Sequence, residues 1–343
     1  MPQTQNNAVM KWLFIFALIV AMHMIFGGYV RLSRSGLSIT EWNPIMGAVP
    51  PMSQQDWQAE FAKYQKSPEY IKVNSSMTLD EYKFIFFTEW LHRFVARLIG
   101  LIYAIPVFYF LLTKKIPFKE FGIYFIMGML IIAEAFMGWY MVSSGLIDRP
   151  SVSHLDLTGH LLLAFSLIGL SLWTALGHKF GFPNSTKNTK WSTPVKLAVA
   201  FLGVLLIQIS YGGFTAGLKA GHVSDTWPLM FGKLIPPNLF NSFIDIFESP
   251  QTIVFIHRWF AFMVLAAVIY VYYIVRKSEY QSDIFQGWQY LVIAVSLQII
   301  LGIFTIVSSV NIVVALMHQA GAIILFTLTI YFIHRFRALD IIS

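Results

Sequence analysis

The chain has 343 residues, of which 57% are hydrophobic and only 12% are charged, and its formal net charge is +7. A water-soluble domain of this size needs a more polar surface, so the composition excludes that class and predicts an integral membrane protein. The chain contains no cysteine, which excludes disulfides and thiolate ligands for a metal.

The first predicted element is an apolar segment at residues 11–30. We interpret it as a retained helix, because no clear small-residue cleavage site of a signal peptide follows it. Seven further segments reach the roughly 20 apolar residues that a membrane-spanning helix needs. They are residues 90–112, 121–142, 155–176, 194–216, 252–275, 288–308 and 312–334. The sequence therefore predicts an all-α protein with eight transmembrane helices.

Basic residues gather in the connections after the second, fourth and sixth segments and in the C-terminal tail. They are Lys114, Lys115, Lys119, Lys179, Lys187, Lys190, Arg276, Lys277, Arg335 and Arg337. The opposite short connections hold essentially one, Arg149. By the positive-inside rule, both termini are predicted in the cytoplasm of a bacterial cell with the protein in its inner membrane. This dispersed charge favours contact with membrane lipids and argues against a nucleic-acid partner.

Two long extracytoplasmic loops, at about 31–88 and 217–250, begin with similar sequences. GGYVRLSRSGLSITEWNPIMGAVPP starts at Gly27, and GGFTAGLKAGHVSDTWPLMFGKLIPP starts at Gly212. Farther on, GWYMVSS from Gly138 resembles GIFTIVSS from Gly302. Chance is the alternative, since Gly, Pro and Trp are common at membrane interfaces, but matches in the same order favour a duplication. We predict two pseudo-symmetric four-helix bundles, residues 1–190 and 191–343.

Each even-numbered segment carries one histidine in its outer part. These are His92, His160, His257 and His318. A lone histidine in a membrane helix is often a hydrogen-bonded packing residue, but four at one depth indicate a function. Two facing helices with one imidazole each form a bis-His haem clamp. Zinc needs three or four clustered ligands, and a dicopper or haem–copper centre needs more histidines around one point. Two haem sites near the extracytoplasmic face are therefore predicted.

Other polar residues accompany these segments. Arg93, Arg97 and Arg258 lie near the outer helix ends, where they either extend to lipid headgroups or bind haem propionates. Glu134 lies inside the third segment, with Gln298 as its repeat counterpart, and is either functional or a protonated packing group. Structural or solvated roles are predicted for the remaining histidines, His23, His154, His178, His222 and His334.

Several stretches together resemble the haem A synthase family, specifically its cysteine-free branch. They are GGYVRLSRSGLSITEWNPIMGAVPP, PEYIKVNSSMTLDEYKFIFFTEWLHR, HLDLTGHL, FIHRWF and ALMHQAGA. The resemblance implies oxidation of the C8 methyl group of haem O to a formyl group through the hydroxylated intermediate haem I, with oxygen from water. The product is haem A for terminal oxidases. It also implies that His92 and His160 hold haem O or haem A, and that His257 and His318 hold a haem b.

Glu89 matches the family's carboxylate before the first histidine. It lies three residues before His92, about one turn away on a similar helix face, so a catalytic role beside the substrate haem is expected. The alternative is a helix-start charge that pairs with Arg93. Val254 occupies the matching place in the second half, and Phe262 replaces Arg97. Other members carry a cysteine pair in the first outer loop; here packing alone must organise loop 31–88, which we expect to cap the first haem site.

Two alternatives belong to other functional classes. One is a di-haem b electron carrier, which bis-His ligation alone would favour because it fills both axial positions of the iron. The other is a haem transporter or chaperone. The family resemblance favours the enzyme and implies the haem O synthase (protohaem farnesyltransferase) and terminal oxidase assembly as partners. The electron acceptor and the formation of a homo-oligomer stay open.

Overall fold

The computed structural model describes residues 5–42, 46–146, 150–182, 191–277 and 282–339. In these ranges eight helices are long and apolar enough to cross a membrane, and no strand longer than a single bridge occurs, which confirms the predicted class. The eight are α1 (Asn7–Leu32), α4 (Leu79–Leu112), α5 (Phe121–Gly145), α6 (His154–Phe180), α7 (Thr193–Gly217), α9 (Pro250–Arg276), α10 (Ser282–Val307) and α11 (Ile312–Leu339). Three cations of the topology argument, Arg149, Lys187 and Lys190, lie outside the described residues.

Helix α4 is longer than predicted. It starts at Leu79 instead of residue 90, because Thr78 and Glu81 form a capping box that satisfies the first free N–H groups. The polar turn that follows, including Asp80 and Lys83, is too hydrophilic for a membrane window, so hydropathy alone missed it. The eleven residues before the predicted span, 79–89, therefore carry the helix into the outer loop.

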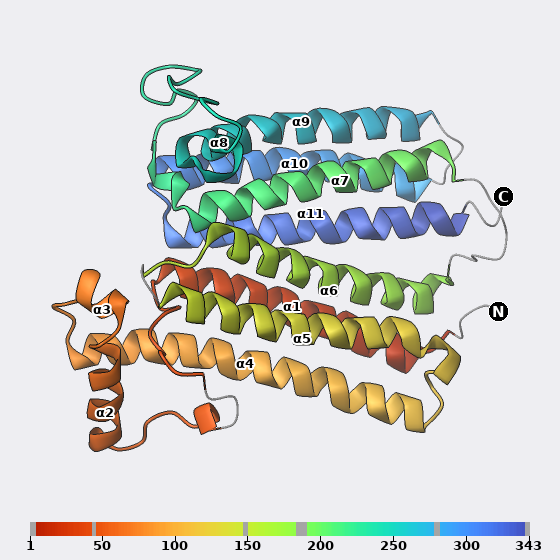
Figure 1. Cartoon of the computed structure of the whole chain (residues 1–343). Coiled ribbons are helices and arrows are strands. Elements are labelled where there is room, and N and C mark those ends of the chain that lie inside the picture. Colours follow the sequence, from red (N-terminus) through yellow and green to blue (C-terminus); the bar gives the residue numbers. More distant parts are fainter. Residues whose placement is uncertain (1–4, 43–45, 147–149, 183–190, 278–281, 340–343) are drawn as a thin grey trace.

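The eight long helices form one bundle whose two ends differ (Figure 1). The start of α1 and the end of α11 lie at one end, while the short helices α2 (Gln54–Tyr64), α3 (Pro68–Lys72) and α8 (Asp245–Glu248) lie at the other. Helix α1 packs against α4 and α6, and α9 packs against α7 and α10. Helix α6 also packs against α7 and α11, which joins the first four long helices to the last four.

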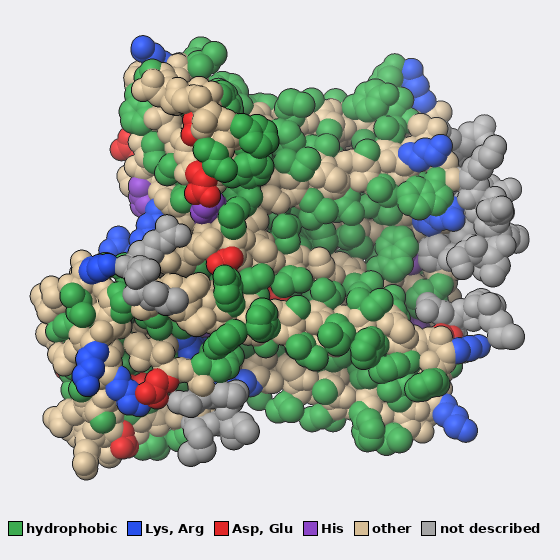
Figure 2. Space-filling view, in the orientation of Figure 1, with side chains coloured by type: hydrophobic (Ala, Val, Ile, Leu, Met, Phe, Trp, Pro, Cys, Tyr) green, Lys and Arg blue, Asp and Glu red, His purple; other side chains and the backbone are tan. Residues whose placement is uncertain are grey.

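The helix surfaces between the two ends are apolar. Figure 2 shows hydrophobic side chains covering the middle of the molecule, with Lys, Arg, Asp and Glu mostly toward the two ends. Ile105 of α4, Phe136 of α5 and Met263 of α9 are each about 60% exposed, at 64%, 59% and 61%. A surface of exposed apolar side chains around the middle of a helix bundle is typical of contact with the lipid bilayer. The chain is a multi-pass membrane protein.

The first outer loop is organised by aromatic packing. Trp57 and Tyr64 of α2 pack on Tyr82 and Phe86 of the extended α4, and the Tyr64 and Tyr82 rings stack with centroids 4.8 Å apart. Ser53 begins α2 with a second capping box. We call residues Ser53–Thr78 the cap. No disulfide is needed for this arrangement, because the buried aromatic area stabilises it.

Candidate haem sites

Each of the four predicted ligand histidines lies against a glycine of a neighbouring helix. The pairs are His92 with Gly27, His160 with Gly138, His257 with Gly212, and His318 with Gly302. A Cβ atom added to these glycines would lie 3.0–3.9 Å from the imidazole ring. The glycines therefore leave the room in which the rings sit between helices, and they are the same glycines that mark the sequence repeat.

The second-half histidines face each other. The rings of His257 on α9 and His318 on α11 are 6.3 Å apart between centroids and nearly perpendicular, at 88°. Two imidazoles that bind one metal ion from opposite sides have centroids about 6 Å apart, since each metal–nitrogen bond is about 2 Å long. This geometry fits one iron held between the two rings.

Two glutamines form hydrogen bonds with His257 and His318. Nε2 of Gln208 is 3.2 Å from Nδ1 of His257 and donates to the His257 carbonyl at 3.0 Å. Nε2 of Gln298 donates to the His318 carbonyl at 2.7 Å. The Gln208 amide therefore contacts both the ring and the backbone of His257, whereas Gln298 contacts only the backbone of His318.

The first-half histidines have different neighbours. The His92 ring stacks on His23 of α1, with centroids 4.2 Å apart and planes 21° from parallel. Oε2 of Glu134 on α5 lies 2.5 Å from Nδ1 of His160, although off the line of a well-formed hydrogen bond. His160 lies near both His23 and His92, so the three imidazoles share one region of the bundle.

The sequence analysis expected His23 to be structural and did not predict its contact with His92. A signal for it exists in the repeat: His23 lies four residues before Gly27, as Gln208 lies four residues before Gly212. Both positions are one helical turn from the glycine beside a ligand histidine. Aligning the repeat beyond the glycine pair would have placed His23 at the site.

The two His-Arg pairs make matching contacts in the two halves of the chain. Arg93 donates to the carbonyls of Ile39 at 2.9 Å and Glu41 at 3.2 Å. Arg258 donates to the carbonyls at the matching places of the second loop, Ser224 at 2.6 Å and Thr226 at 3.0 Å. In both halves the histidine turns toward the bundle and the arginine fastens the outer loop above it. The matched contacts support the duplication, while overall pseudo-symmetry stays a prediction.

Glu89 is almost fully buried, with 3% of its surface exposed, and it is bound to the same loop. Its carboxylate accepts hydrogen bonds from Ser38 Oγ at 2.7 Å and the Ile39 N–H at 2.8 Å, and it pairs with Arg93. The contact with Arg93 is the alternative that the sequence left open. Val254, equally buried, takes this place in the second half without any such bond. A role of Glu89 in catalysis stays a prediction.

Three other histidines contact groups outside the four candidate positions, and their structural role stays a prediction. His154 Nε2 lies 2.7 Å from the carbonyl of Phe247 in the second outer loop, and His178 Nε2 lies 2.8 Å from the Tyr124 hydroxyl. The His334 ring packs edge-on against Trp173. Among the residues the structure describes, no three His, Asp or Glu side chains cluster as ligands of a bare ion.

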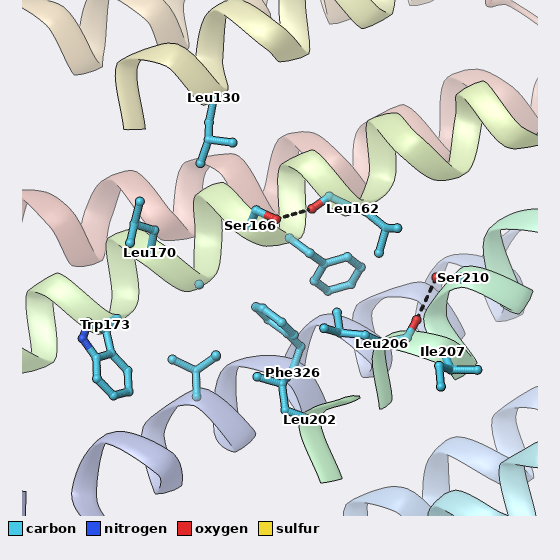
Figure 3. Close-up of a pocket in the computed structure, with 13 residues that line it drawn as sticks. Leu130, Leu162, Ser166, Leu170, Trp173, Leu202, Leu206, Ile207, Ser210 and Phe326 are labelled. Atoms are coloured by element: carbon cyan, nitrogen blue, oxygen red, sulfur yellow. Dashed lines mark hydrogen bonds between the residues drawn. The ribbon is translucent and has the colours of Figure 1, made fainter. Parts of the chain in front are cut away.

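An apolar cavity of about 630 Å³ lies elsewhere, between α5, α6, α7 and α11 (Figure 3). Its lining includes Leu162, Phe165 and Ser166 of α6, which are rotated roughly 140° to 240° from His160 around the helix axis. The Ser166 and Ser210 hydroxyls donate to carbonyls of their own helices. The cavity thus lies on a face of α6 away from His160, and none of the four candidate histidines lines it.

Within the cap, Glu69 is buried beside aromatic rings. Its carboxyl group lies 3.3 Å from the Tyr64 hydroxyl, which also accepts a hydrogen bond from Asn74 at 2.7 Å. Burial, reinforced by the nearby Glu89 carboxylate, raises the pKa of Glu69 to about 7. Lys219 of the second outer loop opposes this shift, which places the two outer loops close to each other.

Similar proteins cover nearly the whole chain. A family model described as cytochrome oxidase assembly protein (COX15-CtaA) matches residues 10–330. The chain is 42% identical over 334 residues to a protein named Heme A synthase from Maricaulis maris, covering 94% of each chain. It is 38% identical to the Heme A synthase of Parvibaculum lavamentivorans, over 96% of this chain and 94% of that one. The Heme A synthase of Flavobacterium johnsoniae is 37% identical, over 96% and 98%.

Proposed function

We propose that this chain, which belongs to the COX15-CtaA family of cytochrome oxidase assembly proteins, is a haem A synthase. Membership makes it an oxidoreductase that acts on haem within the membrane. The finer reaction is oxidation of the C8 methyl group of haem O to a formyl group by way of haem I. Conversion of a methyl to a formyl group releases four electrons and four protons when water supplies the oxygen, so the site must both hold the substrate and pass electrons on.

The observation that carries this proposal is the placement of four histidines against repeated glycines, two in each half of the chain. In the second half, His257 and His318 have the spacing of a bis-His clamp, and their donor atoms suit a haem iron. These residues would hold a haem b, which supplies one-electron transfer when bound. Gln208 holds the ring and backbone of His257, and Gln298 holds the backbone of His318, so the protein's part there would be to keep the ligand geometry rigid.

The first half is better suited to a haem that must react and leave. Helices α4 and α5 touch at few places, whereas their counterparts α9 and α10 pack along each other. This looser seam supports lateral entry of haem O from the bilayer to His92 and His160. Two carboxylates also lie near this pair, with Glu134 beside His160 and Glu89 one turn before His92.

Glu89 and the arginines bind the outer loops that cover the candidate sites. Three donors hold the Glu89 carboxylate in place, where a negative charge would favour positive charge developing on a nearby substituent. Arg93 and Arg258 each use two N–H groups on loop carbonyls. Their remaining N–H groups, together with Arg97 one turn farther along α4, are the proposed contacts to propionates.

The cellular location and the partners are proposed from the family and from the membrane topology. The proposed location is a bacterial inner membrane with both termini in the cytoplasm, in keeping with their common end of the bundle (Figure 1). The proposed partners are the haem O synthase, which supplies the substrate, and the terminal oxidase assembly pathway, which takes the product.

Co-expression with a haem O synthase in a host that lacks haem A tests the function. Haems extracted from purified protein and from membranes are separated by chromatography. Haem A, with haem I as a minor species, is expected only when both proteins are present. Haem b alone in the protein, with haem O unchanged in the membrane, would instead identify a di-haem b electron carrier.

A further inference from the structure

A polar side chain lies one helical turn before each of the four site glycines. In the second half these are two neutral amides, Gln208 and Gln298; in the first half they are an imidazole and a carboxylate, His23 and Glu134. The four positions match in spacing, since each precedes its glycine by four residues. The duplicated scaffold is therefore the same in both halves, and the chemical type of these side chains differs.

The neutral amides contact the second-half ligands without adding charge. Gln298 binds the backbone carbonyl of His318, and Nδ1 of His318 has no hydrogen-bond partner among the residues described. The Gln208 amide reaches Nδ1 of His257 at 3.2 Å. Neither ligand of this half faces a carboxylate through its outer nitrogen.

Glu134 does place a carboxylate there. Its Oε2 is 2.5 Å from Nδ1 of His160, and its side chain is 18% exposed, so little water competes for the contact. In the described part of the chain, its only ion-pair partner within 4 Å is His160.

A carboxylate on the outer nitrogen changes what an imidazole does for a metal. It fixes the tautomer with the proton on Nδ1, orients Nε2 toward the metal and makes that nitrogen a stronger donor. Greater donation from an axial ligand stabilises the ferric over the ferrous state, and a charge in a low-dielectric site acts strongly. A glutamine at this place would orient the ring but would not add negative charge.

We propose that Glu134 is a positioning residue that gives the iron bound by His160 a more negative reduction potential than the iron bound by His257 and His318. The proposal rests on the ligand assignment of the proposed function. A lower potential at the first site directs electrons from the first haem to the second. The Glu134–Gln298 difference would thus divide the duplicated fold into a donor half and an acceptor half.

The test exchanges the two side chains between halves. Wild type, Glu134→Gln and Gln298→Glu are purified with haem b as the sole haem, so that the same haem occupies both sites. Spectroelectrochemical titration gives the midpoint potentials, and His257→Ala assigns the first-half signal. Glu134→Gln is expected to raise the first-half midpoint by about 59 mV or more, a tenfold change in the ferric-to-ferrous ratio. The second-half midpoint should not move.

Gln298→Glu is the matched reverse variant, and it should lower the second-half midpoint alone. An unchanged first-half midpoint in Glu134→Gln overturns the proposal. If that variant retains no first-half haem, Gln298→Glu decides: a lowered midpoint supports the proposal, and an unchanged one refutes it. The haem A yield is scored separately, so a chain that makes no haem A but shows the shifts loses the proposed reaction and keeps this inference.

Discussion

At the scale of single residues, adjacent side chains have different contacts: one lies at a candidate haem site and the next binds the outer loop. His92 and Arg93 are adjacent in sequence, yet the imidazole lies against Gly27 inside the bundle while the guanidinium binds carbonyls of the outer loop. His257 and Arg258 repeat this division. Consecutive residues on a helix point about 100° apart, so one side chain can serve a haem while the next fastens the loop above it.

The histidine pairs should be separable by mutation. His257→Ala is expected to remove the second-half haem b while some first-half haem remains, because each pair sits in its own set of helices. His92→Ala and His160→Ala should abolish haem A formation and keep the second-half haem b. Optical spectra and chromatography of extracted haems measure both results. A full low-spin haem b spectrum in His257→Ala and His318→Ala would refute the assignment.

Glu89→Gln tests the carboxylate that the second half lacks. Glutamine keeps the size and part of the hydrogen bonding, so both haems should still bind, but the charge facing Arg93 is lost. We expect haem A formation to fall by about 100-fold with haem O or haem I accumulating. Glu60→Gln, at a cap position away from the bundle, is the control. Unchanged haem A output from Glu89→Gln at normal protein levels would leave the residue with a loop-anchoring role only.

At the scale of elements, glycines set how closely a helix approaches a ligand ring. Gly212 of α7 lies where an added Cβ would be 3.2 Å from Cε1 of His257, closer than ordinary contact. Gly203 lies on the same helix with no atom within 4 Å of an added Cβ. The two positions therefore differ in the room available for a side chain, while the change in helix propensity is the same at both.

Gly212→Ala should displace the His257 ring and lower haem b occupancy, whereas Gly203→Ala should leave it unchanged. An extra methyl group in a packed site costs about 1–3 kcal/mol, equivalent to a loss of roughly tenfold or more in affinity. The ratio of haem absorbance to protein absorbance measures the occupancy. Equal haem occupancy in both variants would show that the His257 ring can accommodate the added methyl group.

At the scale of the whole molecule, the two sets of four helices share an interface and a covered outer face. Nε2 of Gln319 on α11 donates to the Met24 carbonyl of α1 at 2.8 Å, which links the last helix to the first. On the outer face, the cap buries Glu69 near Lys219 of the second loop. Stability of this face should therefore depend on pH.

Glu69→Gln should stabilise the cap at alkaline pH. The folded-state pKa of Glu69, about 7, is above its unfolded value of 4.5, so wild-type stability is highest below pH 4.5 and falls as pH rises toward 7. Gln does not titrate, and its gain over wild type should reach up to about 3 kcal/mol above pH 7 and vanish near pH 4. Hydrogen exchange of residues 53–78 at both pH values measures it. Asp80→Asn, at an exposed position, is the control; a pH-independent difference for Glu69→Gln would contradict the assignment.

The sequence by itself determined the eight spans, the four ligand candidates and the glycine repeat, because hydrophobic length and helical spacing are local properties of the chain. It could not show that Thr78 starts α4 outside the membrane window, because a cap acts through hydrogen bonds rather than hydropathy. Only the tertiary structure placed His23 on His92, Glu134 beside His160, and Glu89 and Arg93 on residues 38–41. Those contacts join helices and loops far apart in the chain, and their partners are chosen by packing, which no single segment encodes.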